Sequence, residues 1–293
     1  LSVNFSQDVM RTFQEANVFK RLGFKLPPGF DTILSREQHL KSCRAELANL
    51  LVRHSNVCDQ IAETFEELFT DAKTKLDKEI EPGGQTLTWS SLSIDKYLDN
   101  VRTKIGMIEE ALNKVNDIRT FSINKSLTEI VDTRLIPQFK DPIADTQELI
   151  DKVRSHALDA VKQIQFRVQA IQANVCEILR IISTVSEIGV PKDDDEMHIF
   201  QLHKEDHIMV VWTHPVFSLF RTYEGMTSRA ILKCFTLSIN DLCDMLKADK
   251  SKCPALFSTE LKPTVPELSI SPDLDGLQHT LSEVVKVVIH STK

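Results

Sequence analysis

Two histidines four residues apart form the most site-like feature of the sequence. His203 and His207 flank a charged tripeptide, and side chains at i and i+4 of a helix point the same way, as two ligands of a zinc ion do. The zinc-protease pattern needs Glu directly after the first His, where this sequence has Lys204. A metal-dependent hydrolase on this pair would require bound zinc and a carboxylate base. We expect instead polar histidines in a connecting segment, and no metal site.

Acidic and sulfur side chains give no further site. The acidic run at 193–196 lacks the alternating ligands and central Gly of a calcium-binding loop, so we interpret it as a solvated hinge. The cysteines are scattered without a CxxC pair, and several occupy apolar helical positions. We expect buried thiols in a reducing compartment, in preference to disulfides or zinc ligands. These cysteines are Cys43, Cys58, Cys176, Cys234, Cys243 and Cys253.

The sequence contains no motif for nucleotide or acyl chemistry. GxxxxGK[ST], GxGxxG and G-x-S-x-G are all absent, so we expect no catalytic residue, no cofactor and no enzyme in this chain. Acidic side chains outnumber basic ones by 42 to 35 without a long Lys/Arg cluster, which argues against nucleic acid or an anionic membrane as partner. Apolar runs are too short to span a bilayer, and no signal peptide is recognisable. We expect a soluble, intracellular chain.

Helices are the elements that the composition favours. Aromatic residues make up 6% of the chain and only 8 residues are glycine, which favours aliphatic helix packing over sheets. Apolar residues recur at helical spacing in three long runs, at 35–81, 94–136 and 142–189. In the second and third runs the steps alternate between three and four residues, the heptad pattern by which helices pack along a seam. The predicted seam residues are Val101, Ile105, Leu112, Ile164, Ile171 and Ile178.

Three narrow stripes joined by short connections predict a bundle. None of these helices can be stable alone, whereas helices that fold back on one another bury all the stripes together. We predict an all-α fold, with a lead-in helix and turn over 1–34 and a long antiparallel three-helix bundle over 35–191. A smaller, mainly helical subdomain follows over 192–293. It should contain a helix from about Pro215 to Lys247, an extended proline-containing segment at 253–273, and a helix from Leu274 to Ser291.

A corner is predicted between the first two long helices. Pro82 and Gly83 should break the first helix, and Ile94 begins the apolar stripe of the second. Between them Trp89 offers a large apolar ring with one N–H group. We expect Trp89 to be buried and to wedge the two helices at a fixed angle. The alternative is an exposed docking residue for another subunit.

The corner sequence resembles the tail region of dynein heavy chains, especially the axonemal ones. EPGGQTLTWSSLSIDKYL at 81–98 is similar to the family's LTW-S-L-NID turn, with Ser93 where Asn is usual. A second stretch begins with PALF at 254–257 and continues as LSISPDL at 268–274. It resembles the family's P-x-I-x-x-P-S-L passage, with Asp273 where Ser is common. The two motifs also occur in the family's order, with long amphipathic helices between them.

The resemblance implies a non-catalytic tail, or stem, segment of a microtubule-based, ATP-driven motor of cilia and flagella. ATP hydrolysis would then be performed by AAA modules outside this chain. The implied partners are other dynein subunits, namely a heavy chain, intermediate chains and light chains, docked on helical surfaces. The implied location is the cytoskeleton, in the axoneme. From the residues alone, a free-standing spectrin-like or tethering helical bundle without a motor remains the alternative.

Overall fold

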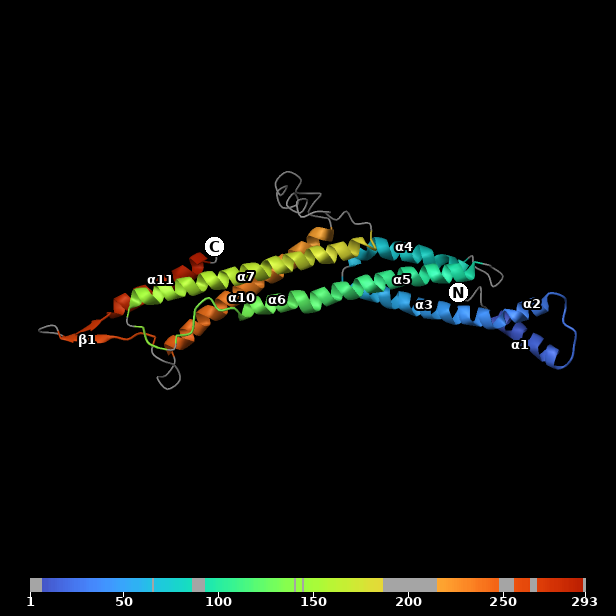
Figure 1. Ribbon diagram of the computed structural model, residues 1–293, viewed down its shortest axis with the longest axis horizontal. Helices are drawn as coiled ribbons and strands as arrows, with labels where there is room; N and C mark the ends of the chain where they lie inside the picture. Colours follow the sequence, from blue (N-terminus) through green and yellow to red (C-terminus); the bar gives the residue numbers. More distant parts are fainter. Residues whose placement is uncertain are drawn as a thin grey trace, which may run out of the picture. The chain divides into compact units, whose positions relative to one another are not determined.

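A computed structural model describes residues 7–64, 66–85, 93–139, 141–143, 145–186, 215–247, 256–263 and 268–291. The chain is shown in Figure 1. The helices are α1 (Gln7–Arg21), α2 (Phe30–Ser35), α3 (Glu37–Thr64), α4 (Glu66–Gln85), α5 (Ile94–Asp117), the π-helix η1 (Ile118–Ile123), α6 (Asn124–Asp132), α7 (Thr146–Ser183), α10 (Pro215–Lys247) and α11 (Leu274–Ser291), and the strands are β1 (Glu260–Pro263) and β2 (Leu268–Ser271).

The predicted all-α class is confirmed. The two strands form one small antiparallel sheet, and nearly all other regular structure in the described ranges is helical. The predicted C-terminal helices are found as α10, which begins at Pro215, and α11, which spans Leu274 to Ser291. Among the described helices, none combines the length and hydropathy needed to cross a membrane. The chain divides into two compact units, one of residues 1–116 and 178–216, the other of residues 117–177 and 217–293.

The first unit contains a bundle of α3, α4 and α5. Polar pairs join α3 to α4, α4 to α5 and α3 to α5, so each helix contacts the other two. The chain reverses direction between α3 and α4, and the 2.7 Å contact between His54 Nε2 and Asp77 Oδ1 joins the two antiparallel helices. It reverses again between α4 and α5, and Lys104 Nζ of α5 lies 2.5 Å from Glu79 Oε1 of α4. Figure 1 shows α4 running along α5, with α3 on the other side of α5 in this view. As a result α3 and α5 run parallel.

Three polar pairs fix the register between α3 and α5. They are His39–Asp95, Glu46–Arg102 and Arg53–Glu109, and each pair joins residues 56 apart in sequence. Successive pairs are seven residues apart on both helices, which is the heptad spacing of flanking charges in a parallel coiled coil. The last pair is bidentate, with Arg53 Nε 3.0 Å and Nη2 2.5 Å from the two carboxylate oxygens of Glu109.

The first predicted helix is two helices. We expected one continuous helix over 35–81, but α3 ends at Thr64, and α4 returns along it. The prediction was wrong because the apolar stripe continues at helical spacing through both helices. Periodicity reports which face of a helix is apolar, and a tight reversal between two helices leaves that spacing nearly unchanged. The fully buried Ile61 and Phe69, on either side of the reversal, belong to one core.

The second unit is organised around the segment that follows α6. The Leu135 backbone N–H donates to Ser238 Oγ of α10 at 3.0 Å, and Arg134 Nε lies 2.6 Å from Asp241 Oδ2 on the same helix. On the other side, His156 Nε2 of α7 lies 3.0 Å from the Arg134 carbonyl oxygen. Residues 134 and 135 therefore hold α10 and α7 together, with Leu135 itself 1% exposed.

Burial along α5 generates a test of the bundle. Ile105 is fully buried, whereas Met107, two residues further on, is 49% exposed. Replacing Ile105 by Ala should lower the free energy of unfolding by about 2–4 kcal/mol, through lost burial and the cavity left behind. The same measurement on Met107→Ala, by urea unfolding followed by circular dichroism, should give a change within about 0.5 kcal/mol. Equal effects of the two substitutions would contradict the packing described above.

Candidate functional site

The predicted corner begins inside a helix. The prediction that Pro82 and Gly83 end the first helix is wrong, because α4 continues through both to Gln85. A proline removes one backbone N–H and crowds only the turn that precedes it. Pro82 stands in the last turn of α4, and the three residues that follow it are still helical. The turn between α4 and α5 therefore starts later than the sequence indicated.

Gly83 allows a tyrosine ring to approach the α4 backbone. Gly83 is buried, and a Cβ atom added to it would lie 2.8 Å from Tyr97 Cζ, closer than carbon atoms can approach. The Tyr97 hydroxyl donates a hydrogen bond to the Ile80 carbonyl oxygen at 2.9 Å, and burial raises the pKa of this hydroxyl. Tyr97 lies in the first turn of α5, so this one side chain ties that turn to the end of α4.

Tyr97 is a corner residue that the sequence pattern did not predict. It is one of two tyrosines in the chain, and it lies one helical turn after Ile94, beside the predicted apolar stripe. Ile94 is 3% exposed and belongs to the core. Trp89 lies outside the described residues, so the proposed Trp wedge stays a prediction.

The six predicted seam residues are all buried. Their exposed fractions lie between 0% and 6%. Val101, Ile105 and Leu112 belong to α5 in the first unit, whereas Ile164 and Ile171 belong to the part of α7 in the second unit. A common seam that joins all six stays a prediction.

The second motif contains a helix cap. Asp273 Oδ1 accepts a hydrogen bond from the Gly276 backbone N–H at 2.8 Å, and the Asp273 carbonyl accepts the first helical bond of α11 from Leu277 at 3.0 Å. Asp and Ser are both strong N-cap residues, because a side-chain oxygen of either reaches the N–H three residues on. Asp273 is therefore the N-cap residue of α11.

Side chains of the types that bind metal ions come together elsewhere in the sequence, on α3, α4 and α5. His203, His207 and the acidic run at 193–196 lie outside the described residues. Within the described ranges, two groups bring imidazole, thiol and carboxylate atoms within 4.8 Å of one another. They are His39, Cys43 and Asp95, and His54, Cys58 and Asp77.

The contact between Gly83 and Tyr97 can be tested by a double substitution. Gly83→Ala should lower the free energy of unfolding by about 1–3 kcal/mol, because the new methyl group displaces the tyrosine ring. In a Tyr97→Ala background the same change should be neutral or stabilising, since Ala favours helix over Gly by about 1 kcal/mol. Urea unfolding of the four proteins measures both effects. Equal costs in both backgrounds would show that Gly83 is not there to accommodate Tyr97.

Comparison with known proteins shows that the chain is similar to dynein heavy chains. The family model "Dynein heavy chain, N-terminal region 1" matches residues 1–97. "Dynein axonemal heavy chain 5" of Mus musculus is 20% identical over 339 aligned residues, which cover all of this chain and 7% of that protein. The "Dynein gamma chain, flagellar outer arm" of Chlamydomonas reinhardtii is 22% identical over 299 residues, covering 99% of this chain and 6% of that protein.

An inner-arm protein matches as well. The "Dynein-1-alpha heavy chain, flagellar inner arm I1 complex" of Chlamydomonas reinhardtii is 18% identical over 297 residues, covering all of this chain and 6% of that protein. The chain thus spans less than a tenth of the length of these relatives. The family model covers the first sequence motif, and the matches along the whole chain cover both motifs. The chain is similar to the N-terminal region of axonemal dynein heavy chains.

Proposed function

We propose that the chain is a non-catalytic tail segment of an axonemal dynein heavy chain, which assembles with other dynein subunits and transmits force. The whole protein would move along microtubules by hydrolysing ATP in modules outside this chain, in the axoneme of a cilium or flagellum. The observation that carries the proposal is similarity to axonemal heavy chains along the whole chain, in a segment built from long helices.

Force transmission rests on the packing between helices. In the first unit, the three polar pairs of α3 and α5 oppose sliding of one helix past the other, because sliding by one heptad would bring Glu46 against Glu109 or Asp95. We assign the transmission of force to the buried seam and to the corner formed by Pro82, Gly83, Trp89 and Ile94.

Subunit docking has a candidate surface in the second unit. In the hairpin, Leu261 pairs with Ile270 and Pro263 with Leu268, and these two pairs share one face because side chains alternate along a strand. The opposite face is polar, because it carries the pairs Glu260–Ser271 and Lys262–Ser269. Leu261, Leu268 and Ile270 are 68%, 73% and 54% exposed. A two-stranded hairpin is marginally stable in water, so this apolar face favours a partner.

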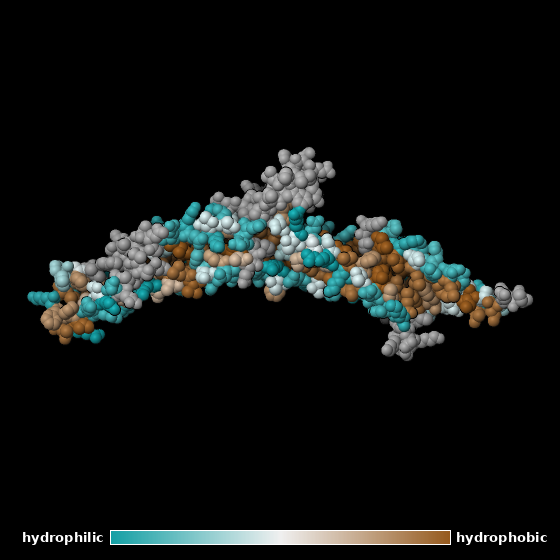
Figure 2. Space-filling view, turned by 180° about the vertical axis from the view of Figure 1, so that it is seen from behind, coloured by the Kyte–Doolittle hydropathy of each residue, from teal (hydrophilic) through white to brown (hydrophobic). Residues whose placement is uncertain are grey.

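The apolar surface continues onto α11. An open groove runs along this helix and is lined by Leu274, Leu277, Gln278, Leu281, Ser282 and Val285. Figure 2 shows hydrophobic side chains gathered in the part of the second unit that contains β1 and α11. The described residues that line the groove are apolar or uncharged, and they recur at three- and four-residue steps, the spacing that accepts the ridge of another helix. We propose an amphipathic helix of another dynein chain as the occupant.

Substitutions on the two faces of the hairpin test the docking proposal. In the full-length heavy chain, changing Leu261, Leu268 and Ile270 to Ser should reduce bound heavy, intermediate or light chain by at least about tenfold, because three side chains lose burial worth on the order of 1 kcal/mol each. Subunit content after density-gradient sedimentation measures the loss. The matched control changes Glu260 and Lys262 to Ser on the polar face and should retain every subunit. Unchanged subunit content in the first variant would contradict the proposed surface.

The absence of a phosphate loop generates a separate test. The 293-residue chain should bind no ATP in titration calorimetry with Mg²⁺ present, because no glycine-rich loop and lysine exist to hold the phosphates. A saturable heat of ATP binding would contradict the assignment of this chain as non-catalytic.

A further inference from the structure

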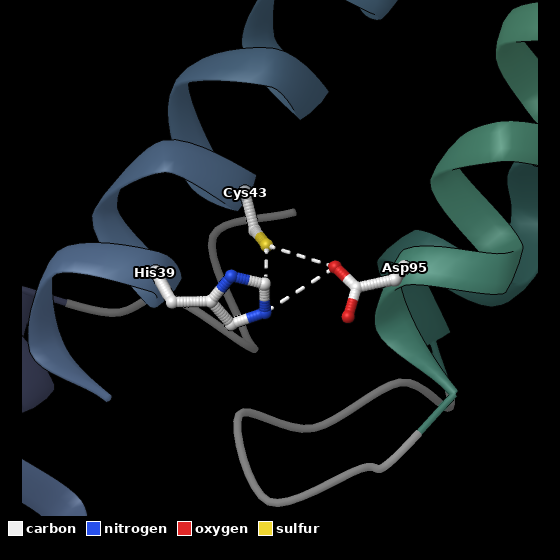
Figure 3. Close-up of side chains that lie close together, drawn as sticks. All are labelled: His39, Cys43 and Asp95. Atoms are coloured by element: carbon white, nitrogen blue, oxygen red, sulfur yellow. Dashed lines mark hydrogen bonds and ion pairs between the residues drawn. The ribbon is translucent and has the colours of Figure 1, made fainter. Parts of the chain in front are cut away.

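Three metal-ligand side chains converge where α3 and α5 begin. His39 and Cys43 are one helical turn apart on α3, and Asp95 stands in the first turn of α5. Because the two helices are parallel, their N-terminal ends lie together. The contact between His39 and Asp95 is the first of the three polar pairs seven residues apart, so the register of the two helices places Asp95 there. Figure 3 shows the three side chains pointing toward one another.

The distances among the three ligand atoms match the edges of a tetrahedral zinc site. Zinc–ligand bonds of about 2.05 Å to nitrogen, 2.3 Å to sulfur and 2.1 Å to oxygen, at tetrahedral angles, give edges of about 3.6 Å for N···S, 3.6 Å for S···O and 3.4 Å for N···O. The structure has 3.6 Å from His39 Nε2 to Cys43 Sγ, 3.8 Å from Cys43 Sγ to Asp95 Oδ1 and 3.2 Å from His39 Nε2 to Asp95 Oδ1. Each edge agrees to within about 0.2 Å.

The same geometry argues against a nucleophile relay. In a Cys–His–Asp relay the thiol contacts one imidazole nitrogen and the carboxylate contacts the other. Here Cys43 Sγ and Asp95 Oδ1 both approach Nε2 of His39. All three atoms face a common point, which is the arrangement of ligands around an ion.

We propose that His39, Cys43 and Asp95 bind a zinc ion that links α3 to α5. A mixed set of imidazole, thiolate and carboxylate ligands is typical of zinc, and hard ions such as Mg²⁺ and Ca²⁺ disfavour sulfur. The ion would be bound by a neutral imidazole, a thiolate and a carboxylate, so the two negative ligands balance the charge of Zn²⁺. The side chains of His39 and Asp95 are 45% and 65% exposed, so water can reach the fourth position. The inference goes beyond the proposed function and does not depend on it.

Without a metal the thiol is neutral. Burial, and then the negative charge of Asp95 and the hydrogen bond to it, raise the pKa of Cys43, while the positive charge of Arg36 lowers it. The protonated thiol donates to Asp95 Oδ1. When zinc binds, the sulfur–hydrogen bond breaks, the proton leaves to solvent, and the electron pair on sulfur forms the bond to zinc.

The second group, His54, Cys58 and Asp77, provides an internal comparison. It repeats the His-x-x-x-Cys spacing fifteen residues along α3 but faces α4. Its imidazole Nε2 lies 2.7 Å from the Asp77 carboxylate, a hydrogen-bond distance that is well below the N···O edge of a zinc site. We therefore assign the metal to the first group and use the second as the control.

Cobalt substitution tests the assignment, because tetrahedral Co²⁺ bound to a thiolate absorbs through sulfur-to-metal charge transfer. Co²⁺ is titrated into the reduced 293-residue chain and into the variants Cys43→Ser and Cys58→Ser, and then displaced by Zn²⁺. The wild-type chain and Cys58→Ser should show the charge-transfer band with one equivalent of metal, whereas Cys43→Ser should lose it. No band in the wild-type chain, or a band lost only in Cys58→Ser, would overturn the proposal.

Exposed ligand positions give a second test that does not depend on a buried residue. Asp95→Ala should weaken Zn²⁺ affinity by at least roughly tenfold in competition with a chromophoric chelator, since even the outer partners of metal ligands contribute that much. Asp77→Ala, in the comparison group, should leave the affinity unchanged. Zn²⁺ should also raise the thermal midpoint of the wild-type chain but not that of Asp95→Ala, because the ion binds only the folded arrangement of α3 and α5. Equal affinities for the two variants would overturn the proposal.

Discussion

The structure depends on apolar stripes too narrow to be stable on a lone helix. In the first unit Ile61, Phe69, Ile105 and Leu112 come from three helices, and each is fully buried. A single helix with one such stripe would leave it in water, and isolated helices gain little from hydrogen bonds alone. Helix formation and helix packing are therefore coupled. The turns, caps and polar pairs act on helices that are stable only when they pack together.

Several arrangements of the helices would bury the apolar stripes, and the polar pairs favour one of them. Along α3 and α5 the charges alternate in sign, with Glu46 opposite Arg102 and Arg53 opposite Glu109. A shift of one heptad in either direction would set like charges side by side, which costs more than the modest gain of a surface ion pair. The pairs contribute specificity of register more than stability. The same register also brings the Asp95 carboxylate to the two ligands on α3.

Three local features lie where this regular packing stops. At the end of α4, Gly83 admits the ring of Tyr97, and at the start of α11 the Asp273 cap lets a helix follow directly from a strand. The hairpin before that cap leaves its apolar face in solvent because no helix in the described part of the second unit covers it.

From local spacing and short motifs we could predict the all-α class, the buried seam positions, the first residues of α10 and α11, and the resemblance to dynein heavy chains. Three features came from the packing of separate helices instead. The apolar run at 35–81 folds back on itself, Tyr97 rather than a helix break holds the end of α4, and Asp95 joins His39 and Cys43. Periodicity relates residues three, four or seven apart on one helix. Contacts between residues 56 apart depend on how separate helices pack, and one-dimensional spacing does not encode that choice.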